Sequence, residues 1–332
     1  MEPLIVGALI VLWSISLATA AELRVRFEPA ESEATVPDRF RLESHTFPYV
    51  MRELPANWWG SIKEYEVTFP SPVTTPFACN NTVHCEYFAP RGTGPHAGVV
   101  VLHILGGDFE LSRTVARTLA VRGVGALFLK MPYYGPRRPE GPRVQMISED
   151  LDRTVAGMTQ AVLDIRRGAA WLAARHEIDQ ARLGITGISL GGIVAGLAGG
   201  VEPRFERVCL VLAGGDLEQI IRQSVETEEI REVWSKREFN LEEVRSRLRV
   251  VDPLTYAGRL KSRQVLMFNA KLDKSIPPDC TRKLWRAVGE PEIHWWNSTH
   301  YSAFWFLPTA CIQIGDFFSR PAAGSAESSQ GG

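Results

Sequence analysis

The stretch Gly-Ile-Ser-Leu-Gly-Gly at residues 187–192 separates an apolar run, 182–188, from a small-residue run, 193–199, that is typical of a tightly packed helix. This pattern predicts a sharp strand-to-helix turn that exposes the hydroxyl of Ser189 above the edge of a sheet. Glycines at the two flanking positions lack the Cβ that would collide in such a turn. The helix that follows directs its N–H groups and positive dipole end at the serine. The stretch therefore indicates acyl transfer chemistry.

Strand and helix patterns alternate outward from this turn. Strands are expected at 63–69, 82–88, 97–102, 124–131, 182–188, 208–212, 265–268 and 292–296, the first two as an antiparallel pair. Helices are expected at 111–122, at 148–175 with Ser148 as N-cap, at 279–288, and at 301–318 with an interruption near Pro308. Such alternation predicts an α/β fold with a mainly parallel, twisted sheet of about eight strands flanked by helices.

The chain divides into five segments by composition. They are a signal peptide at 1–20 or an uncleaved membrane anchor at 4–21, an N-terminal extension at 21–60, the α/β domain at 61–319, a helical insertion within it at 216–262, and a disordered tail at 320–332. The insertion has two equal interpretations, a cap over the carboxyl edge of the sheet or a solvated helix pair. A cleaved signal peptide predicts a secreted or periplasmic protein.

Composition limits the partners of the protein. The 332 residues include 37 basic and 38 acidic side chains, so the formal net charge is −1. No overall charge favours nucleic acid or an anionic membrane, and contact with a membrane is expected only if the N-terminal segment is retained. The sequence gives no indication of the oligomeric state.

Five cysteines are present, and Cys79 and Cys85 are close enough in sequence to form a disulfide if the protein is exported. Together with His84 they lack a four-ligand zinc pattern, so no metal is expected there. No cofactor is expected elsewhere.

A nucleophilic serine needs a base and a group that orients the base. Asp273 follows the strand at 265–268, and His300 follows the strand at 292–296. Because the carboxyl ends of parallel strands meet in one crevice, we expect both side chains to lie near Ser189. Asp216 is the alternative acid, because it follows the strand at 208–212. We favour Asp273, which precedes a proline pair.

These residues resemble the α/β-hydrolase fold over roughly residues 60–319, in the dienelactone hydrolase and acetylxylan esterase-like branch. The resemblance rests on the Ser189 turn, Asp273 with Ile276-Pro277, and His300. It implies an oxyanion hole formed by the backbone N–H groups of Leu105 and Leu190. One departure is Ile104, which stands after His103 where such enzymes often carry glycine. His103 is expected to fix this loop.

The sequence thus predicts a serine hydrolase that cleaves a small-molecule or carbohydrate-linked ester through an acyl-enzyme. A peptidase or amidase of the same fold and a catalytically silent binding protein are the alternatives. Tyr133, Tyr134 and Arg137 are possible pocket residues, with packing of a rigid loop against the sheet as an equal alternative.

Overall fold

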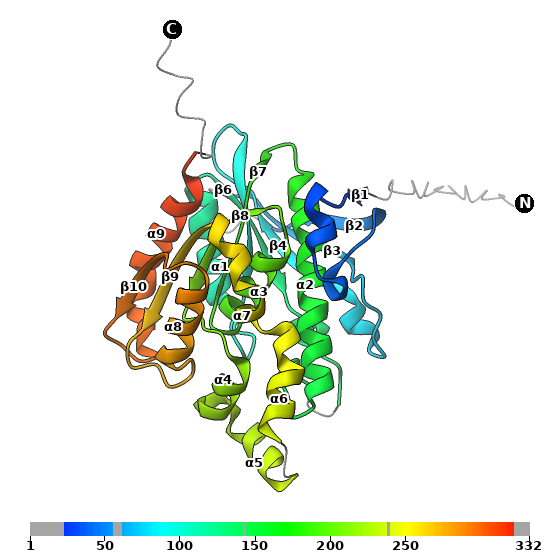
Figure 1. Ribbon diagram of the computed structural model, residues 1–332. Coiled ribbons are helices and arrows are strands. Elements are labelled where there is room, and N and C mark those ends of the chain that lie inside the picture. The colour runs from blue at the N-terminus through cyan, green and yellow to red at the C-terminus, as the bar shows by residue number, and fades with distance from the viewer. Residues whose placement is uncertain (1–22, 56–61, 142–143, 238–239, 322–332) are drawn as a thin grey trace, which may run out of the picture.

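A ten-stranded sheet forms the centre of the fold in the computed structural model, which describes residues 23–55, 62–141, 144–237 and 240–321 (Figure 1). The strands are β1 (Leu23–Phe27), β2 (His45–Glu53), β3 (Glu64–Pro70), β4 (Thr82–Phe88), β5 (His96–Leu102), β6 (Val124–Lys130), β7 (Ile178–Ile188), β8 (Phe205–Val211), β9 (Gln264–Ala270) and β10 (Glu292–Trp296). Their order is β1-β2-β3-β4-β6-β5-β7-β8-β9-β10. Strands β5 to β10 pair in parallel, and β1 to β4 form an antiparallel edge that joins β6. The predicted α/β fold is confirmed.

The prediction of about eight strands is too low, because β1 and β2 extend the antiparallel edge. In β1, Val25 and Phe27 are buried and alternate with exposed arginines, so a short period-2 signal is present. In β2 the alternation is weaker, and Pro48 argues against a strand that pairs on both sides. Pairing of β2 with β1 and β3 overrides that local signal.

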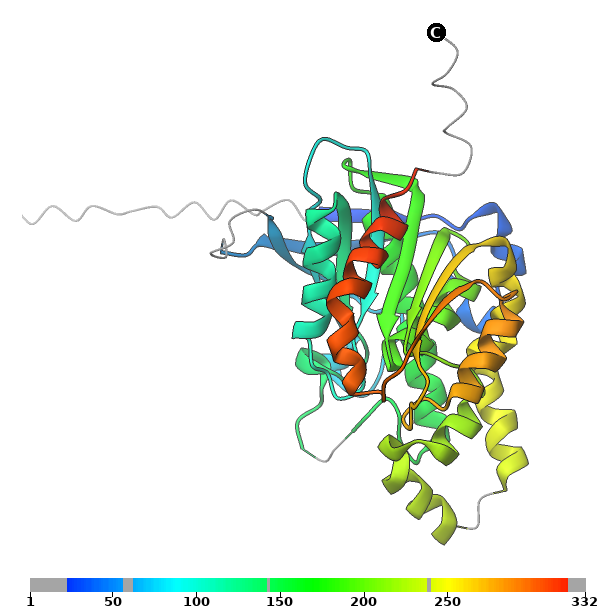
Figure 2. The same ribbon diagram turned by 90° about the vertical axis from the view of Figure 1, so that its left-hand side faces the viewer.

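Helices cover both faces of the sheet (Figure 2). On one face lie α1 (Glu110–Val121) and α9 (Leu307–Ser319), and on the other lie α2 (Leu151–Ala173), α3 (Leu190–Val201) and α8 (Pro278–Ala287). Each face buries its own cluster of apolar side chains against the strands. The strands are consequently covered on both sides, and their carboxyl ends form one edge where loops meet.

Two helix boundaries differ from prediction. Helix α2 begins three residues later than expected and is capped by Asp150, whose carboxylate accepts the N–H groups of Asp152 and Arg153. The Ser148 hydroxyl instead accepts the N–H of Asp150 at 3.3 Å. Pro308 lies in the first turn of α9, where a missing N–H costs nothing, so it starts that helix instead of interrupting it.

The insertion between β8 and β9 is helical and packs onto the domain. It contains α4 (Leu217–Gln223), α5 (Glu228–Lys236), α6 (Leu241–Leu248) and α7 (Pro253–Tyr256). Figure 1 shows α4, α5 and α6 together at one end of the molecule. The indole N–H of Trp234 on α5 donates to the carbonyl of Glu149 at 3.0 Å, which ties the insertion to the segment before α2. The insertion therefore contacts the segment before α2.

The disulfide between Cys79 and Cys85 is not formed, since both thiols are free. Cys85 points into the core from β4, whereas Cys79 is exposed on the preceding 3-10 turn, η3 (Ala78–Asn81). Burial raises the pKa of the Cys85 thiol, which therefore stays protonated. Proximity in sequence did not bring the two side chains to the same side of the backbone.

None of the helices in the described part of the chain is both long enough and apolar enough to cross a membrane. The predicted signal peptide or anchor at 1–21 lies outside the described residues, as do residues 322–332 of the predicted disordered tail.

Candidate active site

Ser189 lies in a sharp turn between β7 and α3, with φ 55° and ψ −117°, a combination that non-glycine residues rarely adopt. A Cβ on Gly187 would lie 2.3 Å from the carbonyl oxygen of Gly191. A Cβ on Gly191 would lie 2.6 Å from the carbonyl oxygen of His103. Only glycine permits this close approach of the start of α3 to the ends of β7 and β5. The turn is the strand-to-helix arrangement expected from residues 187–192.

His300 lies between the other two predicted residues. Its Nε2 is 3.0 Å from the Oγ of Ser189, and its Nδ1 is 2.7 Å from Oδ2 of Asp273. When Nδ1 carries the proton it donates to Asp273, and Nε2 is then able to accept the proton of the Ser189 hydroxyl. All three residues follow the carboxyl ends of different strands, β7, β9 and β10. The structure therefore brings them together at hydrogen-bond distance.

Backbone N–H groups hold the Asp273 carboxylate through Oδ1, the oxygen that does not contact His300. Oδ1 accepts the backbone N–H groups of Ser275 and Ile276, each at 2.8 Å. The neighbouring Leu272 N–H donates to the carbonyl of Ser298 at 3.0 Å, which ties the loop after β9 to the loop after β10. Oδ2 is thereby directed at His300, and the side chain of Asp273 is only 1% exposed. Backbone N–H groups thus hold the carboxylate that contacts the imidazole of His300.

Asp216, the alternative acid, has other partners. It lies at the N-cap of α4, where its Oδ1 accepts the N–H of Gln219 at 3.3 Å. Its Oδ2 accepts from the ammonium group of Lys283 on α8. The structure places Asp273, and not Asp216, against His300.

His103 organises the loop that carries Leu105. Its Nδ1–H donates to the carbonyl of Ile104 at 2.8 Å, and its Nε2 accepts the N–H of Met131 at 3.0 Å. Burial lowers the pKa of His103 to about 4, so the ring is neutral and able to act as donor and acceptor at once. Gly106 and Gly107 follow with φ of 88° and 78°, and the Gly107 N–H closes the turn on Ile104. His103 thus links this loop to the end of β6.

The two residues expected to donate to an oxyanion lie on either side of Ser189. Leu190 is the first residue of α3, where a helical N–H has no partner within its own helix. Leu105 lines both hollows that Ser189 lines. This placement leaves the N-terminal end of α3 facing the serine, which favours negative charge there.

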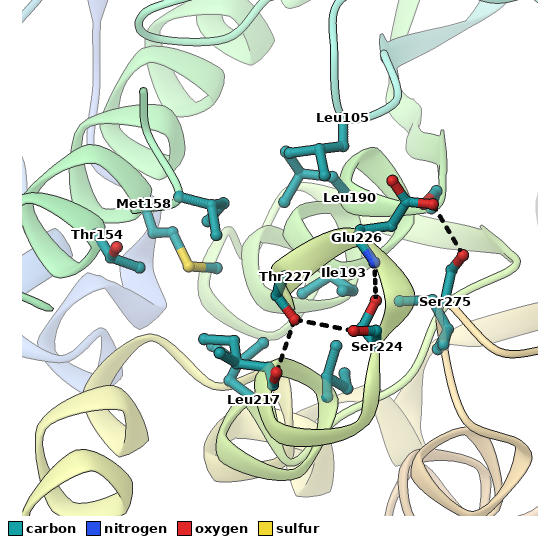
Figure 3. Close-up of a pocket in the computed structure, with 15 residues that line it drawn as sticks. Leu105, Thr154, Met158, Leu190, Ile193, Leu217, Ser224, Glu226, Thr227 and Ser275 are labelled. Carbon is teal, nitrogen blue, oxygen red and sulfur yellow. Dashed lines mark hydrogen bonds between the residues drawn. The ribbon is translucent and has the colours of Figure 1, made fainter. Parts of the chain in front are cut away.

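A small apolar hollow of about 60 Å³ lies between Ser189 and the cap (Figure 3). Its walls come from α2, α3 and α4, and include Met158, Ile193 and Leu217. Ile220 and Ile221 of α4 complete the apolar side formed by the cap. The sequence analysis missed these residues, although the apolar spacing 217, 220, 221 on a short helix is the period expected of a buried face.

A second, open groove of about 750 Å³ starts at Ser189 and His300 and runs between α1 and α9. Apolar side chains line most of it, among them Leu111, Phe304 and Ile312. Phe304 is 60% exposed, so the groove is open to solvent at that end. Ser189 therefore faces one small apolar hollow and one large groove.

Two of the three possible pocket residues turn out to be structural. Arg137 is fully buried and forms an ion pair with Asp164 at 2.8 Å, while also donating to the carbonyls of Lys130 and Asn80. Tyr133 is 6% exposed and lines neither hollow at Ser189. Tyr134 is nearly buried as well and lines a third hollow, of about 520 Å³, which Leu105 also lines. The loop after β6 is a packed support.

Replacement of Arg137 by methionine is expected to destabilise the fold by about 3–5 kcal/mol, because Asp164 would remain buried without its counter-charge. Burial already raises the pKa of Asp164, and Arg137 opposes that rise. In the variant Asp164 would be protonated when folded and would release the proton on unfolding. The destabilisation should therefore grow between about pH 5 and about pH 8. Urea denaturation at both pH values measures it, with Arg137→Met/Asp164→Leu as the control that regains more than half of the loss.

The sheet order, the sharp turn at Ser189 and the three residues at its carboxyl edge define an α/β-hydrolase. Two family models match the chain, alpha/beta hydrolase domain containing 18 over residues 60–216 and the prolyl oligopeptidase family over residues 157–294. The chain belongs to the α/β-hydrolase superfamily, as the sequence predicted.

Solved structures of acetyl xylan esterases share this fold. The enzyme from Paenibacillus sp. R4 is 22% identical over 81% of this chain and 88% of its own, with a TM-score of 0.65. Acetyl xylan esterase 1 from Thermoanaerobacterium sp. JW/SL YS485 is 17% identical over 80% and 87%, with a TM-score of 0.62. The predicted likeness to the acetylxylan esterase-like branch is confirmed at the level of the fold.

Curated relatives are also similar to part of the chain. An uncharacterized protein of Mycobacterium tuberculosis, found in strains CDC 1551 / Oshkosh and ATCC 25618 / H37Rv, is 25% identical over 188 residues. The match covers 56% of this chain and 44% of that protein, so the chain spans less than half the length of these relatives.

Proposed function

We propose that this hydrolase cleaves carboxylic esters through an acyl-enzyme, with Ser189 as nucleophile, His300 as general base and Asp273 as the group that orients the base. The proposal rests on one observation, the position of the His300 ring between Ser189 Oγ and Asp273 Oδ2 at 3.0 and 2.7 Å. The structural likeness to acetyl xylan esterases supports ester chemistry.

In the proposed reaction, His300 Nε2 takes the hydroxyl proton as Ser189 Oγ attacks the carbonyl carbon of the ester. The backbone N–H groups of Leu105 and Leu190 stabilise the oxyanion. The bond to the alcohol then breaks, and the alcohol leaves with the proton from His300. Water, deprotonated by the same imidazole, hydrolyses the acyl-serine and regenerates the enzyme.

The two spaces beside Ser189 suggest how an ester would bind. A cavity of about 150 Å³ is needed for a molecule of the size of benzene, so the hollow of about 60 Å³ under the cap suits only a short acyl group. The open groove leads to solvent and is suited to the alcohol part. We propose short acyl esters of a small or carbohydrate-linked alcohol as substrates.

A peptidase or amidase is the second possibility, favoured by the match to the prolyl oligopeptidase family over residues 157–294. A panel of p-nitrophenyl esters from acetate to octanoate, measured beside aminoacyl and acyl p-nitroanilides, separates the two. We expect kcat/KM for acetate to exceed that for octanoate by about 10-fold or more, since a missing or extra methylene in an apolar pocket changes binding by about 1–3 kcal/mol. Anilides hydrolysed as fast as esters would support a peptidase instead.

We also propose that the protein is exported. The apolar segment 4–21 and the sequence Ala18-Thr19-Ala20 support this. N-terminal sequencing of the mature protein distinguishes cleavage after Ala20 from a retained anchor.

A further inference from the structure

Glu226 stands where the spaces around Ser189 meet. It belongs to the short 3-10 turn η5 (Val225–Thr227) between α4 and α5 of the insertion, and it lines the small hollow, the open groove and the third hollow. Figure 3 shows its carboxylate extending from the cap toward Ser275. It is the one charged residue among those that line the small hollow, all of which belong to the described part of the chain.

Hydrogen bonds hold this carboxylate against the two loops of the proposed catalytic residues. Its Oε1 accepts the hydroxyl of Ser275, two residues after Asp273, at 3.1 Å. The same oxygen accepts the hydroxyl of Tyr301, the residue after His300. The bond to Glu226 raises the pKa of the Tyr301 hydroxyl, which therefore remains a donor. Neither donor carries a positive charge, so these bonds position the carboxylate without neutralising it.

Basic groups are scarce near this carboxylate. Within the described ranges, no lysine, arginine or histidine lies within ion-pair distance of Glu226. Apart from His300, the lysine, arginine, aspartate and glutamate residues that line the open groove are all acidic: Asp108, Glu110 and Glu226. Glu110 is compensated by its ion pair with Arg113, and Arg138 lines the third hollow, which Glu226 also lines, but not the open groove. The space beside Ser189 that suits an alcohol part is therefore negatively charged.

We infer, on the basis of the proposed esterase activity, that Glu226 is a specificity-determining residue that makes the site favour esters with a cationic leaving group and reject esters with an anionic one. A uniform negative charge in a cleft attracts cations and repels anions over several ångströms. Because Glu226 is exposed to solvent, its attraction for a charged substrate is screened. We expect each unit of substrate charge to change kcat/KM by about 5-fold.

Three acetyl thioesters of graded charge test this inference. S-acetylthiocholine is cationic, S-(3,3-dimethylbutyl) thioacetate is its neutral isostere, and S-acetyl-2-mercaptoethanesulfonate is anionic; thiol release is followed with Ellman's reagent. In the wild type the cation should exceed the anion in kcat/KM by about 20-fold, and in Glu226→Gln this ratio should fall below about 3-fold. Glutamine retains an acceptor for Ser275 and Tyr301, so a merely structural role would leave the ratio unchanged.

Glu232→Gln is the matched control, because Glu232 lies on α5 of the same cap and lines none of the three hollows. It removes the same charge and should keep the wild-type ratio. If Glu226→Gln does not fold, the wild-type ratio is measured from about 0.01 M to about 1 M salt, where screening should reduce it toward one. A ratio that responds to neither change overturns the inference. Failure to hydrolyse even the neutral thioester would instead contradict the proposed function.

Discussion

Ser189→Ala is expected to lower kcat for an activated ester by about 10⁶-fold with little change in KM, which corresponds to about 8 kcal/mol of transition-state stabilisation. The reason is that the variant lacks the Oγ that lies 3.0 Å from His300 Nε2 and would attack the ester. The oxyanion donors would remain, so a residual rate above that in water of about 10³-fold is expected. Stopped-flow assays of p-nitrophenyl acetate hydrolysis measure the fast rate of the wild type, and long-time assays measure the residual rate of the variant.

A matched control is Ser112→Ala on α1. The Ser112 hydroxyl is buried and has no hydrogen-bond partner among the described residues, so its loss should change neither folding nor activity. Comparable activity of Ser189→Ala and the wild type, with Ser112→Ala also active, would show that ester hydrolysis does not use Ser189.

Asp273→Asn is expected to lower kcat by about 10⁴-fold, because the amide cannot accept the Nδ1 proton in the way the carboxylate does and would favour the wrong imidazole tautomer. The side chain is nearly the same size, and its second oxygen position still faces the N–H groups of Ser275 and Ile276. The fold should therefore survive, and a thermal melt checks that. Steady-state kinetics over the whole pH range in which the protein is stable give the loss in kcat.

Asp216→Asn provides the comparison, since it alters the alternative acid in the same way. Asparagine still caps α4 and loses only the partly exposed contact with Lys283, so activity should stay within about 3-fold of the wild type. A large loss in Asp216→Asn beside a small loss in Asp273→Asn would mean that the acid has been assigned to the wrong residue.

The part of the site that follows strands was predictable from the sequence. The glycines at 187 and 191 permit the sharp turn at Ser189, where a Cβ would clash, and a parallel sheet brings its carboxyl ends to one edge. Asp273 and His300 each follow a strand directly, so topology alone carries them to that edge. Asp273 and His300 lie 84 and 111 positions after Ser189 in the sequence, and general rules of sheet packing placed both near it.

Contacts between side chains far apart in sequence were not predictable. Arg137 was a possible pocket residue, with packing of a rigid loop as an equal alternative, and its partner Asp164 is 27 residues away on α2. Cys79 and Cys85 are close in sequence, but a 3-10 turn and a strand direct their side chains apart. Glu226 lies in a charged insertion whose pattern does not show which single carboxylate faces the serine. In each case tertiary packing decides, and a single sequence carries no record of it.

The central claim is that Ser189 is an activated nucleophile, and covalent labelling with a fluorophosphonate tests it most directly. The intact mass of the wild type should rise by one phosphonyl group, with the modification on the peptide that contains Ser189. Ser189→Ala should take no label, and His300→Ala should be labelled at least about 100-fold more slowly, since general-base assistance contributes about 10²–10⁴-fold. A folded wild-type protein that remains unlabelled, or a label that persists in Ser189→Ala, would contradict the claim.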